Sequence, residues 1–242
     1  IGQAVRFAAG LPNDSGAVPD APADIINLSL GGAPFDQSRQ NLYNEVKAAG
    51  VIVVAAAGNN ASRMPLYPAS YNNVISVSAV DAQRRLAVYS NYGAAVDVSA
   101  PGGDRGVDLN GDGFPDGILS TSGEIRPDNS LNYVYSFLDG TSFAAPHVSG
   151  VLALMKSVNP DLTPADIDNL LASGALTDDL GPAGRDDDYG HGLINAQRAV
   201  LAALEASGSS PANNPILVAS ATTLNFGGNT SSLTLTLGNV GG

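Results

Sequence analysis

The stretch VIVVAAAGNN, residues 51–60, constrains the fold most strongly, because its apolar residues run together without alternating with polar ones. A strand of this kind has to be covered on both faces, as the strands of a parallel sheet are. Apolar residues with helical spacing precede it over residues 35–49, and Gly50 closes that pattern. Strands interleaved with helices predict an α/β fold with a mostly parallel sheet flanked by helices. Further short apolar runs predict strands within residues 23–32, 73–80 and 94–102.

Further helices are predicted at both ends of this α/β unit. Residues 1–10 have helical spacing, and Gly10 would stop that helix. The run that follows Ser142 is apolar nearly all round, which is typical of a helix in the middle of a protein. Thr163 and Pro164 form a helix-start signature, and the pattern up to residue 206 predicts a last helix. We therefore place the α/β unit within residues 1–206.

The C-terminal residues differ in composition from this unit. Residues 207–215 are rich in Ser, Asn and Pro, which predicts a linker. Residues 216–242 have leucines that alternate with polar residues after a double glycine, which predicts the start of a β-sandwich-like module that is cut short. Because the chain opens with neither an initiator Met nor a signal-peptide pattern, we interpret it as a piece of a longer protein.

The composition excludes several classes of partner and of chemistry. The formal charge of −12 has the wrong sign for binding a phosphate backbone, so no nucleic-acid partner is expected. No apolar run reaches the roughly 18 residues that span a bilayer, so no membrane span is expected. The absence of cysteine excludes disulfides, thiolate metal sites and a cysteine nucleophile. With 44% hydrophobic and 14% charged residues, the chain is globular and can bury a sizeable core.

The stretch DGTSFAAPHVSG, residues 139–150, puts Ser142 among small neighbours at the start of the apolar helix. A helix N-terminus has unpaired backbone N–H groups and the positive end of the dipole, which together favour an anion. A serine there is a candidate nucleophile next to an oxyanion site. The simpler alternative is that Ser142 or Thr141 only caps the helix. In the same way, Asn59 in GNN could be only a turn residue.

The motifs GTSFAAPHVSG, AAAGNN and INLSLGG resemble, in the same order, motifs of the subtilisin-like serine protease family. YPASY, VDVSAPG and YGHGLINA add to the resemblance, which covers residues 1 to about 205. It implies a three-layer subtilisin-like fold whose N-terminal part is missing. It also implies that Ser142 is a nucleophile that forms an acyl-enzyme, and that Asn59 donates a side-chain amide to the oxyanion.

The resemblance further implies a substrate-binding edge and a specificity pocket for a protein or peptide substrate. Leu66 stands where the family often has a glycine on the pocket floor, which predicts a shallower apolar pocket. Without the resemblance, the residues of the edge would be a strand end and a turn. The edge is formed by Ser29, Leu30 and Gly31, and the pocket wall by Ala57 and Gly58.

The general base that hydroxyl attack requires is not evident in this chain, which has two histidines. His147 lies five residues after Ser142 on the same helix, about 140° round from it, and is interpreted as a core or structural histidine. His191 lies in a segment that is not catalytic in the family. In subtilisins the catalytic Asp and His precede the Ser, and motifs of their type do not occur here.

Two interpretations remain open for the function. The first is a secreted serine endopeptidase domain without its N-terminal part, which would be inactive alone because it lacks the base. The second is a non-catalytic, calcium-stabilised binding or adhesive module on a degenerate protease fold.

The stretch DLNGDGFPD, residues 108–116, has oxygen side chains at alternate positions around a glycine, as an EF-hand loop has. The loop predicts a structural Ca²⁺ site. Leu119 stands where an EF-hand has its bidentate Glu, so a weaker site is expected. A solvated acidic loop is the alternative. The predicted ligands are Asp108, Asn110, Asp112, Asp116 and the carbonyl group of Phe114.

The resemblance implies a second cation site. Backbone carbonyl groups of Ala69, Tyr71 and Val74 would join the carboxylate of Asp97 there. A plain loop is the alternative. The acidic run within residues 178–189 is interpreted as solvated surface.

Overall fold

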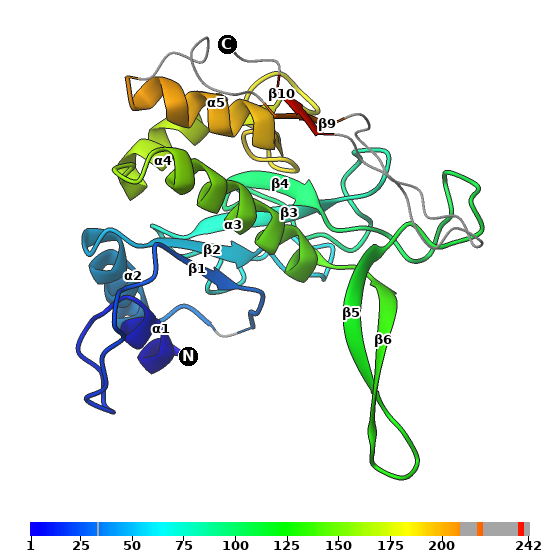
Figure 1. The fold of residues 1–242 in the computed structure, drawn as a ribbon, viewed down its shortest axis with the longest axis horizontal. Helices are drawn as coiled ribbons and strands as arrows, with labels where there is room; N and C mark the ends of the chain where they lie inside the picture. The colour runs from blue at the N-terminus through cyan, green and yellow to red at the C-terminus, as the bar shows by residue number, and fades with distance from the viewer. Residues whose placement is uncertain (33, 209–216, 220–236, 240–242) are drawn as a thin grey trace.

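The computed structural model describes residues 1–32, 34–208, 217–219 and 237–239, and it confirms the predicted α/β fold (Figure 1). A six-stranded sheet has the order β1-β2-β3-β4-β8-β7. The first five of these strands are parallel, and the edge strand β7 runs antiparallel to β8. The strands are β1 (Ile25–Leu28), β2 (Ile52–Ala56), β3 (Ile75–Val80), β4 (Val98–Pro101), β7 (Thr177–Asp178) and β8 (Leu193–Ile194).

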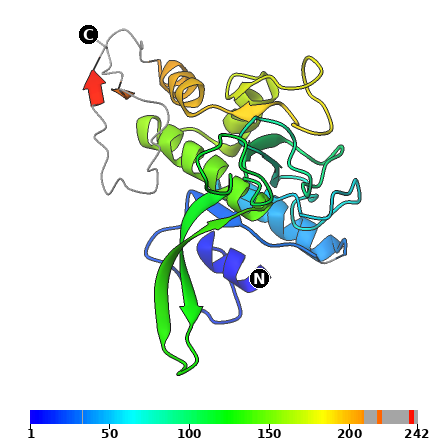
Figure 2. The same cartoon turned by 90° about the vertical axis from the view of Figure 1, so that its right-hand side faces the viewer.

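Helices cover both faces of the sheet, which makes three layers (Figures 1 and 2). Strand β2 shows why its sequence does not alternate. Val54 packs with the helices of one face, while Val53, the next residue, packs with those of the other. Both side chains are almost fully buried. On one face lie α3 (Thr141–Val158), α4 (Pro164–Ala172) and α5 (Ala196–Ala206), and on the other α1 (Gly2–Ala8) and α2 (Gln37–Ala48).

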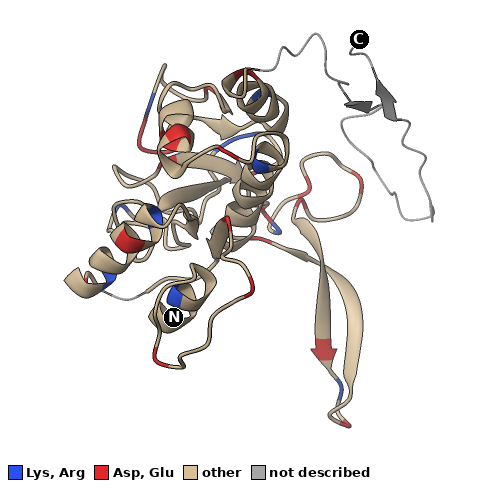
Figure 3. Ribbon diagram, turned by 60° about the vertical axis from the view of Figure 1, so that its left-hand side comes forward, with Lys and Arg blue, Asp and Glu red and all other residues tan. Residues whose placement is uncertain are grey.

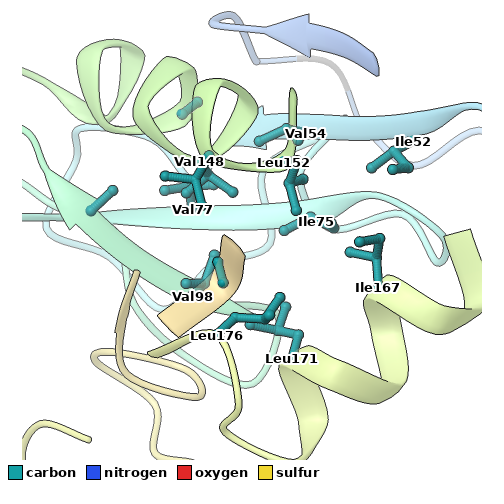
Figure 4. Close-up of a cluster of buried hydrophobic side chains, with 14 of the residues drawn as sticks. Ile52, Val54, Ile75, Val77, Val98, Val148, Leu152, Ile167, Leu171 and Leu176 are labelled. Carbon is teal, nitrogen blue, oxygen red and sulfur yellow. The ribbon is translucent and has the colours of Figure 1, made fainter. Parts of the chain in front are cut away.

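The larger core cluster lies between the sheet and α3. Figure 4 shows Val148 and Leu152 of this helix against Val54 and Val77 of the neighbouring strands. Leu152 is 1% exposed, so this packing removes its side chain from water. Burying a residue of this size stabilises the fold by roughly 1.5–3 kcal/mol. The core therefore fixes the helix that carries Ser142 to the middle of the sheet.

The helix starts follow the expected capping chemistry. Thr163 and Asp166 form a capping box at α4, with the Thr163 Oγ1 atom accepting from the Asp166 N–H. Asp36 caps α2 by accepting from the Arg39 N–H at 3.0 Å. Hydrogen bonds from the Ser38 side chain and the Arg39 N–H lower the pKa of the Asp36 carboxyl group. These caps fix where the two helices begin.

A long hairpin, which the sequence analysis did not predict, leaves the sheet-forming part at the N-terminal end of α3 (Figures 1 and 2). It consists of β5 (Ile118–Ile125) and β6 (Leu131–Leu138), paired antiparallel. Tyr133 and Tyr135 lie on one face of it and are 82% and 77% exposed. The β-branched and aromatic residues Tyr133, Val134, Tyr135 and Phe137 are the sequence signal that could have revealed this strand.

Little of the predicted C-terminal module is described. Strand β9 (Leu217–Ala219) pairs antiparallel with β10 (Leu237–Asn239). The remainder of the predicted linker and module, residues 209–216, 220–236 and 240–242, lies outside the described residues. Across the part that is described, Lys and Arg positions are scattered among Asp and Glu positions (Figure 3). No helix there is long and apolar enough to cross a bilayer.

Candidate active site

Ser142 is the second residue of α3 and lies close to the segment that follows β1. Its Oγ atom donates to the carbonyl oxygen of Ser29 at 3.4 Å, and the Ser29 Oγ atom donates to the carbonyl oxygen of Ser142 at 2.7 Å. Its side chain is partly exposed. Among the described residues, no acceptor is bonded to the backbone N–H of Ser142. This N–H lies in the first turn of α3, where backbone donors have no partner within the helix.

Asn59 lies beside the start of the same helix. Its Oδ1 atom accepts from the N–H of Thr141 at 2.9 Å and from the Thr141 Oγ1 atom at 2.8 Å. These two donors fix the orientation of the amide, because its other end, Nδ2, can only donate. A Cβ atom placed on Gly140 would lie 3.1 Å from Nδ2, so this nitrogen lies over the residue that precedes the helix. The structure thus places Asn59 beside the first turn of the helix that carries Ser142.

Thr141 joins the end of β2 to the start of α3, a role that the sequence did not reveal. Its side chain is fully buried. The Oγ1 atom accepts from the N–H of Gly58 at 3.1 Å while it donates to Asn59. One hydroxyl group therefore connects the turn after β2 to the residue before Ser142.

Leu66 fills the space between the two glycine-containing segments. A Cβ atom placed on Gly58 would lie 2.6 Å from the Leu66 Cδ2 atom, and one placed on Gly31 would lie 2.8 Å from it. The side chain therefore occupies the gap between the end of β2 and the segment after β1. Ala57 is buried beside this gap, and Leu30 is 41% exposed. The structure thus brings the six predicted substrate-binding residues to one end of the sheet.

Neither histidine is hydrogen-bonded to Ser142 within the described part of the chain. The Nδ1 atom of His147 lies 2.7 Å from the carbonyl oxygen of Phe143. His147 lies on a face of α3 that no other part of the described chain covers, and its side chain is exposed. The interpretation of His147 as a core residue is therefore wrong. The backbone N–H of His191 donates to the carbonyl oxygen of Asp97, and burial together with Arg185 lowers the pKa of its imidazole.

One face of α3 is uncovered, although the helix is apolar nearly all round. Leu154 is 51% exposed, and Ala153 and Gly150 are exposed beside it. The opposite face of the helix is buried in the core, where Met155 is 0% exposed. The predicted central position is therefore correct for one side of the helix only.

The loop of residues 108–116 folds around Asp108. Its Oδ1 atom accepts from the N–H of Gly111 at 2.7 Å, and its Oδ2 atom accepts from the N–H of Gly113 at 2.9 Å. Asn110 donates to Asp112, and the N–H of Leu109 donates to the Oδ2 atom of Asp116 at 2.6 Å. Within the described residues, no group of three or more His, Cys, Asp or Glu side chains converges to hold a metal ion. The loop has the tight turns that suit a cation, but its carboxylates bind backbone N–H groups.

The residues of the second predicted cation site line one pocket of about 440 Å³. Burial raises the pKa of the Asp97 carboxyl group to about 6, although the N–H of Ser76 donates to it at 2.8 Å. Lys47 also lines the pocket and pairs with Asp168. The other predicted residues in the lining are Ala69, Tyr71 and Val74.

A partly exposed hydroxyl group at a helix N-terminus, beside an oriented amide, suits the attack on a carbonyl carbon. The profile of the subtilase family matches residues 1–192, and the chain belongs to this family.

Similar proteins agree with this assignment. The chain is 40% identical over 210 residues to an extracellular protease of Xanthomonas campestris pv. campestris, covering 84% of this chain and 33% of that protein. It is 37% identical over 180 residues to subtilisin DY of Bacillus licheniformis, covering 73% of this chain and 56% of that protein. A solved protease structure from Pseudoalteromonas arctica PAMC 21717 matches with a TM-score of 0.71 and 36% identity, over 84% of this chain and 57% of that one. The chain therefore spans between about a third and just over half of these proteins.

Proposed function

We propose that this chain is part of a serine endopeptidase that cleaves peptide bonds through an acyl-enzyme on Ser142. The observation that carries the proposal is the pair of hydrogen bonds from Thr141 to Asn59, which hold an amide beside the nucleophile. The Ser142 Oγ atom attacks the carbonyl carbon and its proton passes to a general base, which then protonates the leaving amine. Water hydrolyses the acyl-enzyme in the second half of the reaction.

The Nδ2 group of Asn59 and the backbone N–H of Ser142 serve as the oxyanion donors in this proposal. The Ser142 N–H has no acceptor among the described residues, and the Oδ1 atom of Asn59 is held by Thr141. Both donors are in place before charge develops on the substrate oxygen, so little reorganisation is needed. The first turn of α3 adds the positive end of its dipole.

The catalytic Asp and His lie, in this proposal, in a segment that precedes Ile1 in the full-length protein. The uncovered face of α3 next to Ser142, with Gly150 and Ala153 exposed, gives that segment a surface to pack against. The 242 residues alone would then be inactive, because the hydroxyl of Ser142 has no base within reach.

Leu66 restricts the pocket for the residue before the cleaved bond. Its Cδ2 atom lies between Gly31 and Gly58, where a deeper pocket would need open space. We expect the enzyme to prefer small apolar side chains at this position, since a large ring would overlap with Leu66.

Calcium is proposed as a structural cofactor. Asp108, Asn110 and Asp112 would supply side-chain oxygens, with Asp116 and the Phe114 carbonyl group completing the set. Bound Ca²⁺ would take the place of some of the backbone N–H groups that these carboxylates now bind. Asp97 and the carbonyl groups around its pocket form a second candidate. An extracellular setting, where Ca²⁺ is abundant, fits both sites, and we propose that the protein is secreted.

A serine-directed fluorophosphonate probe tests the proposed function on the full-length protein. We expect labelling of the wild-type protein and none of the Ser142→Ala variant. Ser149→Ala is a matched control, because Ser149 lies on the same helix and donates to Asn27. Labelling that persists in Ser142→Ala would contradict the assignment of the nucleophile.

A non-catalytic binding module remains the second candidate, and the position of the two histidines favours it. Neither is bonded to Ser142 in the described chain. A wild-type full-length protein that does not react with the probe, while it binds Ca²⁺, would support this candidate over the protease.

A further inference from the structure

The turn after β2, residues 57–62, has a backbone that few residues adopt without support. Gly58 has φ 113°, and Ala61, which carries a side chain, has φ 48°. An alanine in this left-handed region costs roughly 1–2 kcal/mol. Asn59 lies between the two and is exposed, so the turn does not fix it by burial. Other groups must hold these residues in place.

Asn91 binds this turn at three points. Its Nδ2 atom donates to the carbonyl oxygen of Ala57 at 2.9 Å. Its Oδ1 atom accepts from the N–H of Asn60 at 2.9 Å and from the N–H of Ser62 at 3.2 Å. The three bonded residues lie on both sides of Asn59, so one side chain brackets the proposed oxyanion donor.

Asn91 is itself rigidly held. Its side chain is 4% exposed, and its backbone N–H donates to the carbonyl oxygen of Gly58 at 2.8 Å. A Cβ atom placed on Gly58 would lie 2.4 Å from the Asn91 Nδ2 atom, so the amide packs directly on that glycine. The adjacent Ser90 Oγ atom accepts from the N–H of Ala79 in β3 at 3.0 Å. Asn91 and the adjacent Ser90 together therefore connect the turn to the central sheet.

We propose that Asn91 is a positioning residue for Asn59. The inference rests on the proposed function, because it assigns to Asn91 the task of holding an oxyanion donor. Without the Asn91 side chain, the carbonyl group of Ala57 and the N–H groups of Asn60 and Ser62 lose their partners. The turn then relaxes, and the amide of Asn59 moves away from the point where the charge develops.

A double-mutant cycle in the full-length protein tests this role with a short peptide substrate. Since misplacement by about 1 Å costs up to roughly 100-fold in rate, we expect Asn91→Ala to lower kcat by about tenfold with KM nearly unchanged. In the Asn59→Ala background the same substitution should lower kcat by less than about twofold, since the donor that it positions is already gone.

A second buried asparagine provides the matched control. Asn159 is 6% exposed, and its Nδ2 atom donates to the carbonyl oxygen of Ala203, far along the chain from the turn. Asn159→Ala should lower the thermal midpoint and leave kcat at temperatures below unfolding unchanged. If Asn91→Ala does not fold, Asn91→Leu keeps the branched shape without adding a charge, removes all three hydrogen bonds, and should show the same loss of kcat.

Two results would overturn the inference, and both differ from a failure of the proposed function. One is a double variant whose loss of kcat equals the product of the losses of Asn91→Ala and Asn59→Ala, which would mean that the two residues act independently. The other is an unchanged kcat in a folded Asn91→Ala variant. By contrast, a wild-type rate in Asn59→Ala would contradict the oxyanion role itself.

Discussion

Two loops that leave the same end of the parallel sheet are held in opposite ways. The turn after β2, residues 57–62, is bonded to the buried side chains of Asn91 and Thr141. The loop after β4, residues 102–117, contains the acidic stretch, whose carboxylates bind N–H groups of that stretch. Half of the residues of the second loop are exposed, and only Gly102 and Gly103 are buried. One loop takes its shape from the interior of the protein, and the other largely from itself.

This difference bears on what each loop can do. A donor that stabilises developing charge must be in place before the reaction, which requires a rigid support. The turn after β2 has that support. The carboxylates of the second loop are exposed or partly exposed and can reach a cation, and the shape of the loop then depends on whether the cation is bound. We therefore expect changes in the first loop to alter rate, and changes in the second to alter stability.

The largest expected effect is that of Asn59→Ala in the full-length protein. In a subtilisin, removal of one oxyanion-hole donor lowers kcat by about 10²–10³-fold, and we expect a loss of this size here. KM should change little, whereas the thermal midpoint should fall, because the N–H and Oγ1 of the buried Thr141 lose their acceptor. Steady-state kinetics and a thermal melt measure both. Asn60→Ala is the neighbouring control, since its side chain forms no hydrogen bond among the described residues. A comparable drop in that variant would contradict a specific role of Asn59.

The next effect concerns the pocket beside this turn. Leu66→Gly removes the side chain that lies between Gly31 and Gly58. A change of this kind in an apolar pocket is worth about 1–3 kcal/mol in discrimination. We expect kcat/KM for peptides with Phe before the cleaved bond to rise about tenfold or more relative to peptides with Ala. Met64→Gly is the control: Met64 lies two residues before Leu66 in the chain and is 74% exposed, so its removal should leave the ratio of kcat/KM for Phe and Ala peptides unchanged. A ratio that stays constant in Leu66→Gly would show that another residue limits the pocket.

The sequence revealed the parts of the fold whose residues are buried on both faces or capped. The run at 51–56 and the Thr163 signature predicted β2 and α4, which the structure has. It did not reveal the hairpin of β5 and β6, because its strands lie outside the sheet and its exposed tyrosines do not resemble a buried run. Likewise, Asn91 could not be recognised as a support of the turn, since its partners lie about thirty residues away in the sequence.

The smallest expected effect is that of Ca²⁺ on the second loop. At a concentration tenfold above its Kd, a ligand of the folded state adds about 1.4 kcal/mol, which raises the midpoint of a protein of this size by about 3–6 °C. Asp108→Asn should abolish this rise, because Asp108 is the residue around which the loop folds. Asp128→Asn is the control: Asp128 is exposed in the turn of the hairpin and accepts from the N–H of Ser130.

The rate on a short peptide below the melting range should be the same with and without Ca²⁺ within about twofold, since the residues that support the first loop do not belong to the second loop. If Ca²⁺ changes the rate but not the thermal midpoint, the second loop affects catalysis and not stability, and the proposed difference between the two loops is wrong.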